Sequence, residues 1–218
     1  MWLLCPPGVY RPQDDTSLLG EALPSETLAD GADVLDLGTG SGALALAAAS
    51  RGAVRVTAVD ASARAVCAAR LNARLNGRRV RVLRGDLTAP VAGRRFDLIL
   101  ANPPYVPSPR ANHARRGLSL ARNAGPDGRA LLDRICAETP PLPRPGGVLL
   151  LVQSGLCGVE STLRQLGGAG LRPVATGHRR IPFGPLLRRR AAWLAARGLI
   201  EPGEEQEELV VIRAERLP

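Results

Sequence analysis

Short apolar runs alternate with helical patterns along this chain of 218 residues. Runs rich in valine and leucine, bounded by glycine or charged residues, predict strands at residues 33–37, 54–60, 80–84, 97–101 and 147–153. The stretches between and around them predict helices at residues 16–29, 42–51, 62–76, 126–138 and 159–166. Asp15 or Thr16 is the expected N-cap of the first helix, and Gly77 ends the third. This alternation predicts an α/β fold with a parallel sheet.

The last part of the chain departs from this pattern. Residues 171–176 and 209–214 predict two further strands, and residues 185–197 between them have helix-forming composition with a basic surface. We expect residues 181–208 to be a basic helical insertion before the last strand. A solvated surface helix with a charged loop is the favoured interpretation, and a lid or partner-docking element is the other. We expect one domain over residues 1–218, opened by a leader and helix at residues 1–29.

A glycine-rich loop, Asp36-Leu37-Gly38-Thr39-Gly40-Ser41-Gly42, joins the first strand to its helix. Glycines let a backbone turn tightly against a ligand, and the helix N-terminus behind them offers free N–H groups. Doubly wound sheets bind ligands at this strand end. Spacing alone allows a nicotinamide dinucleotide, because Gly38, Gly40 and Ala43 fit its fingerprint and Asp60 follows about 20 residues later.

An acidic residue two positions before the first glycine separates the possible cofactors. A carboxylate there would repel a pyrophosphate, but it favours the ammonium and sulfonium charges of S-adenosylmethionine (SAM). With glycines at alternate positions, the loop resembles motif I of class I SAM methyltransferases. Asp60 then fits the ribose hydroxyls, and Asp86 fits the adenine amino group. The cofactor-binding residues predicted in this region are Asp36, Gly38, Gly40, Gly42, Asp60 and Asp86.

The fourth predicted strand ends in Asn102-Pro103-Pro104-Tyr105. Two prolines cannot continue a sheet, so the chain leaves the strand and Asn102 lies at its end. Asn102 Oδ1 and the Pro103 carbonyl form two adjacent acceptors, which suit the two hydrogens of an –NH2 group. We therefore predict Asn102, Pro103 and Tyr105 as the catalytic residues, with Tyr105 packing on the target group or forming a wall of its pocket.

Composition narrows the partners. The net charge is +9, which could indicate nucleic acid, but every basic residue is an arginine and none is a lysine. We attribute this to a GC-rich coding bias and do not favour a nucleic-acid partner. We find no membrane span or signal peptide and expect a cytoplasmic protein. The four cysteines are far apart, so we expect no metal site or disulfide and interpret them as buried thiols. His113 and His178 are interpreted as surface residues.

Together, motif I and N-P-P-Y resemble the HemK/PrmC family of release-factor glutamine N5-methyltransferases over residues 8–155. The leader Gly8-Val9-Tyr10-Arg11-Pro12-Gln13-Asp14-Asp15-Thr16-Ser17-Leu18-Leu19 is similar to the "Y-x-P-x-E-D-T-x-L-L" opening of its short branch, which lacks the N-terminal helical domain. Gly125-Pro126-Asp127-Gly128 occupies the place of a G-x-D/N-G turn before a helix. The resemblance departs from the family at Asp36, where a glutamate is common in this branch, and in the length of residues 181–208.

This resemblance implies a seven-stranded, mostly parallel sheet with helices on both faces and an antiparallel last strand. It implies SAM as cofactor and adds Thr16 and Asn102 to the cofactor-binding residues. The implied partners are a release factor as protein substrate and, in the short branch, a small zinc-binding activator subunit.

Other functions remain open at this stage. N-P-P-Y also occurs in methyltransferases that act on the exocyclic amine of adenine in DNA or RNA, where Tyr105 could stack on a flipped base. A natural-product N-methyltransferase is a third possibility. A SAM-fold subunit that only binds is the non-enzymatic one, against which the intact loop, Asp60 and Asn102 argue.

Overall fold

The computed structural model describes residues 1–51, 55–109 and 124–217. Its seven strands form one sheet in the order β3-β2-β1-β4-β5-β7-β6. β7 pairs antiparallel with both β5 and β6, whereas the pairs among β1 to β5 are parallel. The predicted mostly parallel sheet with an antiparallel last strand is confirmed. The strands are β1 Asp33–Leu37, β2 Arg55–Asp60, β3 Val80–Arg84, β4 Phe96–Ala101, β5 Pro143–Ser154, β6 Leu171–Pro182 and β7 Gln206–Arg216.

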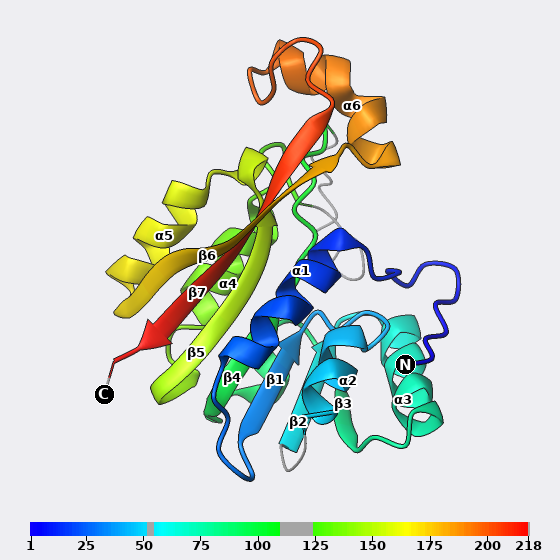
Figure 1. The fold of residues 1–218 in the computed structure, drawn as a ribbon, viewed down its shortest axis with the longest axis vertical. Coiled ribbons are helices and arrows are strands. Elements are labelled where there is room, and N and C mark those ends of the chain that lie inside the picture. The colour runs from blue at the N-terminus through cyan, green and yellow to red at the C-terminus, as the bar shows by residue number, and fades with distance from the viewer. Residues whose placement is uncertain (52–54, 110–123, 218) are drawn as a thin grey trace.

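Helices cover both faces of the sheet (Figure 1). On one face α1 packs beside α2, and Gly42 at the start of α2 lies against Ala69 of α3. On the other face α4 packs beside α5. The central strands β1 and β4 are buried almost throughout, as expected for a sheet covered on two sides. The helices are α1 Asp14–Ala22, α2 Ala43–Ala49, α3 Ala63–Leu75, α4 Ala130–Glu138, α5 Val159–Gly168 and α6 Pro185–Ala196.

The first helix differs from its prediction at both ends. It begins at Asp14, and neither Asp15 nor Thr16 is its N-cap, because extended Gln13 precedes it without a side-chain cap. It ends at Ala22 and continues only as a 3₁₀ turn, Leu23–Ser25. Pro24 explains this end, since proline lacks the N–H that the next helical turn requires.

Two later boundaries also differ. α4 begins at Ala130 instead of residue 126, because Gly125 and Gly128 have φ values of +78° and +79° that an α-helix does not allow. β6 and β7 extend to Pro182 and from Gln206, so the predicted insertion over residues 181–208 is shorter. α6 and its loops occupy residues 183–205 and stand beyond the sheet (Figure 1).

The excursion around α6 has its own small core. Phe183, Leu187, Leu194 and Ile200 pack together there, apart from the main core of the sheet. In the described part of the chain, no helix combines the length and apolar character needed to cross a membrane.

Candidate functional site

A cavity of about 650 Å³ opens at the carboxyl ends of the parallel strands. Its volume is in the usual range for small-molecule sites, about 300–1,000 Å³. We call its two parts the glycine-loop half, at the ends of β1 to β3, and the Asn102 half, at the ends of β4 and β6 and the start of β7. Most of the predicted site residues line it: Gly38, Gly40, Asp60, Asp86, Asn102, Pro103 and Tyr105. Thr16, Asp36 and Gly42 do not line the cavity and lie behind the residues that do.

The glycine loop turns tightly over the start of α2. Gly38 has a φ of +72°, and a Cβ there would meet no atom within 4 Å, so the backbone at Gly38 is open to a ligand. Gly42 serves packing instead, because a Cβ at Gly42 would come within 3.2 Å of Ala69. The loop therefore offers its backbone to the cavity at one glycine and closes helix packing at another.

Asp36 lies beneath this loop and is 1% exposed. Its Oδ2 accepts hydrogen bonds from the Thr39 hydroxyl at 2.6 Å and from the Ala45 N–H at 3.0 Å. Burial raises the pKa of Asp36 from its ordinary value of 3.8 to about 6, although both hydrogen bonds oppose the shift. Asp36 thus holds the loop against α2 and places a negative charge under it.

Asp60 and Asp86 line the glycine-loop half. Each oxygen of Asp60 accepts one backbone N–H, Oδ2 from Gly40 at 2.9 Å and Oδ1 from Ser62 at 2.8 Å. Lone pairs remain on both oxygens for a ligand. Asp86 forms a bidentate ion pair with Arg134 of α4, at 3.0–3.1 Å.

Asn102 is oriented by a chain of hydrogen bonds from α1. Its Nδ2 donates to Thr16 Oγ1 at 3.2 Å, and Thr16 Oγ1 donates to Asp15 Oδ1 at 3.2 Å. This arrangement uses the donor end of the amide, so Asn102 Oδ1 is left as an acceptor. Thr16 was predicted to touch the cofactor, and in the structure it contacts the predicted catalytic amide.

Asp15 is the centre of a cluster that the sequence interpretation missed. The hydroxyls of Tyr10 and Tyr105 both donate to its Oδ2, at 2.7 and 3.0 Å. Burial, followed by the charge of Asp15, raises the pKa of Tyr10 and of Tyr105, so both stay protonated donors. Asp15 had been considered only as a helix cap, although Asp14-Asp15-Thr16 belongs to the quoted leader motif.

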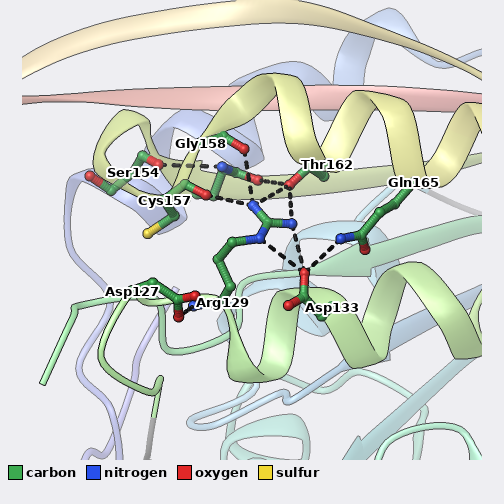
Figure 2. A network of polar contacts seen from close by, with 9 residues as sticks. Asp127, Arg129, Asp133, Ser154, Cys157, Gly158, Thr162 and Gln165 are labelled. Atoms are coloured by element: carbon green, nitrogen blue, oxygen red, sulfur yellow. Dashed lines mark hydrogen bonds and ion pairs between the residues drawn. The ribbon is translucent and has the colours of Figure 1, made fainter. Parts of the chain in front are cut away.

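The turn before α4 supports the N-P-P-Y loop from behind. Arg129 is buried, and its guanidinium donates to the carbonyls of Cys157 and Gly158, to Thr162 and to Asp133 (Figure 2). Cys157 in turn donates from Sγ to the Tyr105 carbonyl at 3.0 Å. Arg129 thereby connects α4 and α5 to the segment that bears Tyr105.

Two asparagines fasten the leader to α3. Asn72 accepts the Leu4 N–H at 2.8 Å and donates to the Leu4 carbonyl at 3.0 Å, and Asn76 makes the same pair of bonds with Trp2. Asn72 also donates to the Ser41 carbonyl of the glycine loop at 2.8 Å. The leader then passes over the cavity, where Gly8, Val9 and Tyr10 line it.

The α6 excursion is part of the site. Gly184, Pro185, Leu186, Leu187 and Arg190 line the Asn102 half. The favoured interpretation of a solvated surface helix is therefore incomplete, because one side of α6 forms a wall. Of the two histidines, His178 is exposed as predicted, and His113 lies outside the described residues. Cys136 and Cys157 are buried, but Cys67 is exposed, contrary to the prediction of buried thiols.

Sequence comparison decides the family. The model of the methyltransferase small domain matches residues 2–170, which is most of the chain. The chain belongs to the methyltransferase small domain family. One relative comes from Methanocaldococcus jannaschii and is named there, by inference, as a protein N5-glutamine methyltransferase. It is 35% identical over 83% of this chain and 90% of its own length. The release factor glutamine methyltransferase of Bordetella pertussis is 39% identical over 79% of this chain and 66% of its own.

Solved structures show the same fold for this methyltransferase. The E. cuniculi Mtq2–Trm112 complex, described as responsible for methylation of the termination factor eRF1, contains a chain with a TM-score of 0.66 at 24% identity, covering 95% of this chain and 98% of that one. The 16S rRNA G1207 methyltransferase RsmC of T. thermophilus, solved with AdoMet and guanosine, has a TM-score of 0.61 at 24% identity, covering 96% of this chain and 46% of that one. These likenesses are to the fold.

Proposed function

We propose that this methyltransferase transfers the methyl group of SAM to the side-chain amide nitrogen of a glutamine in a release factor. One observation carries the proposal: Thr16 holds the donor end of the Asn102 amide, which leaves Oδ1 as an acceptor, and Pro103, whose carbonyl we assign as the second acceptor, lines the same cavity. This pair of acceptors matches the –NH2 group of a carboxamide. The names of the relatives from M. jannaschii and B. pertussis support the same acceptor.

The glycine-loop half suits SAM in shape and charge. Asp36 gives the loop a negative charge, Gly38 leaves room for close approach, and Asp60 has lone pairs for the ribose hydroxyls. We assign the adenine end to Asp86, whose acceptor capacity is shared with Arg134. When bound, SAM would supply an electrophilic methyl group.

The role of Asn102 follows from the chemistry of the acceptor. A carboxamide nitrogen is a poor nucleophile because its lone pair is delocalised into the carbonyl. Asn102 Oδ1 and the Pro103 carbonyl would accept both hydrogens, which fixes the nitrogen and favours its pyramidal, more nucleophilic form. Alignment of this kind can lower a barrier by about 7–11 kcal/mol. No strong base is required, since the proton can leave after the N–C bond forms.

Tyr105 argues against a flipped base as acceptor. Its side chain is 8% exposed, and its hydroxyl is bound to Asp15. A buried ring held in this way offers little face for stacking, which a flipped adenine would need. We assign Tyr105 to the wall of the Asn102 half.

The test offers labelled SAM and several acceptors in parallel: a release factor with a Gly-Gly-Gln loop, the same factor with that glutamine changed to alanine, duplex DNA and total RNA. Because the E. cuniculi structure is a complex with Trm112, each reaction is run with and without a partner subunit of the Trm112 kind. We expect label on the release factor alone, and only when the glutamine is present.

Asn102→Ala serves as the matched variant. It should bind SAM as wild type does and lose transfer, because the methyl donor remains while the amide is no longer held. Near-normal turnover by Asn102→Ala would contradict the proposal, and so would label on RNA or DNA in place of the protein.

A further inference from the structure

Glu207 is a buried carboxyl group in the Asn102 half that the proposed reaction does not use. It lies near the start of β7, lines the cavity and is 7% exposed. Its Oε2 is the one buried side-chain polar atom without a hydrogen-bond partner among the described residues. A buried acceptor without a donor costs about 1–3 kcal/mol, and more when charged, so such an atom asks for an explanation.

No described side chain or main-chain group donates to this oxygen. The Tyr10 and Tyr105 hydroxyls donate to Asp15. Of the two arginines that line the cavity, Arg134 pairs with Asp86 and Glu138, and Arg190 donates from Nη1 to the Pro107 carbonyl.

The electrostatic surroundings of Glu207 also favour a hydrogen-bond donor at Oε2. Burial raises the pKa of Glu207, and the nearby charge of Asp15 acts in the same direction, although a side-chain hydrogen bond with Ser154 opposes the shift. A donor placed against Oε2 would offset both the missing hydrogen bond and the repulsion. Since no described group donates to Oε2, an N–H or O–H group of a bound ligand can fill this place.

We propose that Glu207 is the acceptor-recognition residue of this enzyme, and that its Oε2 accepts a hydrogen bond from an N–H group of the acceptor peptide beside the target carboxamide. The inference rests on the proposed function, since it places a peptide in the Asn102 half. Both –NH2 hydrogens of the target are assigned to Asn102 and Pro103, so the N–H in question is a second one. It belongs either to the peptide main chain or to a basic side chain near the glutamine.

The neighbouring residue supplies a matched control. Glu208 follows on the same strand, is exposed and pairs with His178 outside the cavity. Binding of the release factor is measured by calorimetry on enzyme loaded with S-adenosylhomocysteine, so that no turnover is needed. We expect Glu207→Leu to weaken binding roughly ten- to a hundredfold, the range of one hydrogen bond to a charged group. Glu208→Leu should bind as wild type does.

Two further measurements separate recognition from structure. Glu207→Leu should unfold at the same temperature as wild type or higher, because it removes an unsatisfied buried polar atom. Its affinity for SAM should stay within about twofold of wild type, which corresponds to about 0.4 kcal/mol. A loss of SAM affinity would overturn the proposal by assigning Glu207 to the cofactor.

Peptide arms identify the donor. One peptide carries an N-methylated main chain next to the glutamine, and another has its basic side chains replaced by norleucine. Whichever peptide binds wild type weakly and is unaffected by Glu207→Leu lacks the N–H that Glu207 accepts. Equal binding of the unmodified factor by wild type and Glu207→Leu would overturn the proposal, as would no binding by wild type. Labelled transfer by wild type judges the proposed function separately.

Discussion

The Thr16 hydroxyl determines which end of the Asn102 amide meets the acceptor. It accepts a hydrogen bond from the Asn102 amide and donates one to Asp15, so its direction is fixed from both sides. Without it, the Asn102 amide could rotate and present its N–H₂ group to the substrate. The precision of the active site therefore depends on a residue that does not line the cavity.

Thr16→Val should reduce kcat about tenfold or more, because the loss of one hydrogen bond that orients a reacting group is worth roughly 1–2 kcal/mol. Thr16→Ser should retain most of the activity, since it keeps the hydroxyl. Steady-state kinetics with the release factor provide the comparison, alongside calorimetry with SAM. A change in SAM affinity without a change in kcat would show that Thr16 serves the cofactor and not Asn102.

Asp36 should make the cofactor-free enzyme sensitive to pH. Its pKa in the folded protein, about 6, lies above the ordinary 3.8. The carboxyl therefore contributes most to stability below pH 4, and that contribution is lost as the pH rises through about 6. The shift corresponds to about 3 kcal/mol.

Asp36→Asn should remove this pH dependence and raise the unfolding temperature at pH 7.5 while weakening SAM binding. Calorimetric melts at pH 5 and pH 7.5 provide the measurement, with the exposed Asp30→Asn as control. If wild type and Asp36→Asn changed in parallel between the two pH values, Asp36 would not be the group responsible.

At the scale of elements, the turn before α4 and the N-P-P-Y loop share one small space. A Cβ added to Gly128 would lie 2.3 Å from the Tyr105 carbonyl oxygen and 2.6 Å from Cys157 Sγ. Neither neighbour can yield easily, because one is main chain and the other is buried. The N-P-P-Y loop therefore requires glycine at position 128, more than twenty residues further along the chain.

Gly128→Ala should displace the N-P-P-Y loop and lower kcat strongly while leaving SAM affinity within a few-fold of wild type. Gly93→Ala is the control, because Gly93 has a similar φ of +75° but no atom within 4 Å of an added Cβ. Both variants carry the cost of a left-handed backbone, about 1–2 kcal/mol, so their difference in melting temperature isolates the clash. Equal losses of stability and activity in the two variants would remove the clash as the cause.

How far the sequence predicts this molecule depends on the range of the interactions. Asp60, Asp86 and Asn102 follow apolar strands, and parallel strands bring their carboxyl ends to one edge, so a local pattern located them. Asp15 and Glu207 were not found, because their roles arise from contacts between α1, β4 and β7. Glu207 lay in a tract of glutamates that is typical of solvated loops, and only the strand register shows that it is buried.

At the scale of the whole molecule, Asn72 connects three segments that frame the glycine-loop half. One amide joins α3 to Leu4 of the leader and to Ser41 of the glycine loop. Asn76, four residues later, holds only Trp2 and its own helix. Asn72 therefore holds both the leader and the glycine loop in place at the site.

Asn72→Ala should weaken SAM binding about tenfold and lower stability by roughly 1–3 kcal/mol, since it leaves several main-chain groups without partners. Asn76→Ala, which removes bonds only to Trp2 and to its own helix, should have a much smaller effect on SAM affinity. Calorimetric titration of the two variants side by side measures the difference. Equal and small effects would mean that the leader stays in place without these bonds.

The same fastening has a practical consequence for expression and purification. Any affinity tag fused ahead of Met1 would begin one residue from Trp2, whose main chain is bound to Asn76. A bulky or charged fusion at that point would compete with the fastening and depress cofactor affinity for reasons unrelated to catalysis. β7 ends at Arg216, near the C mark in Figure 1 and far from the cavity that its first residues line. A tag that follows this strand is therefore the safer choice.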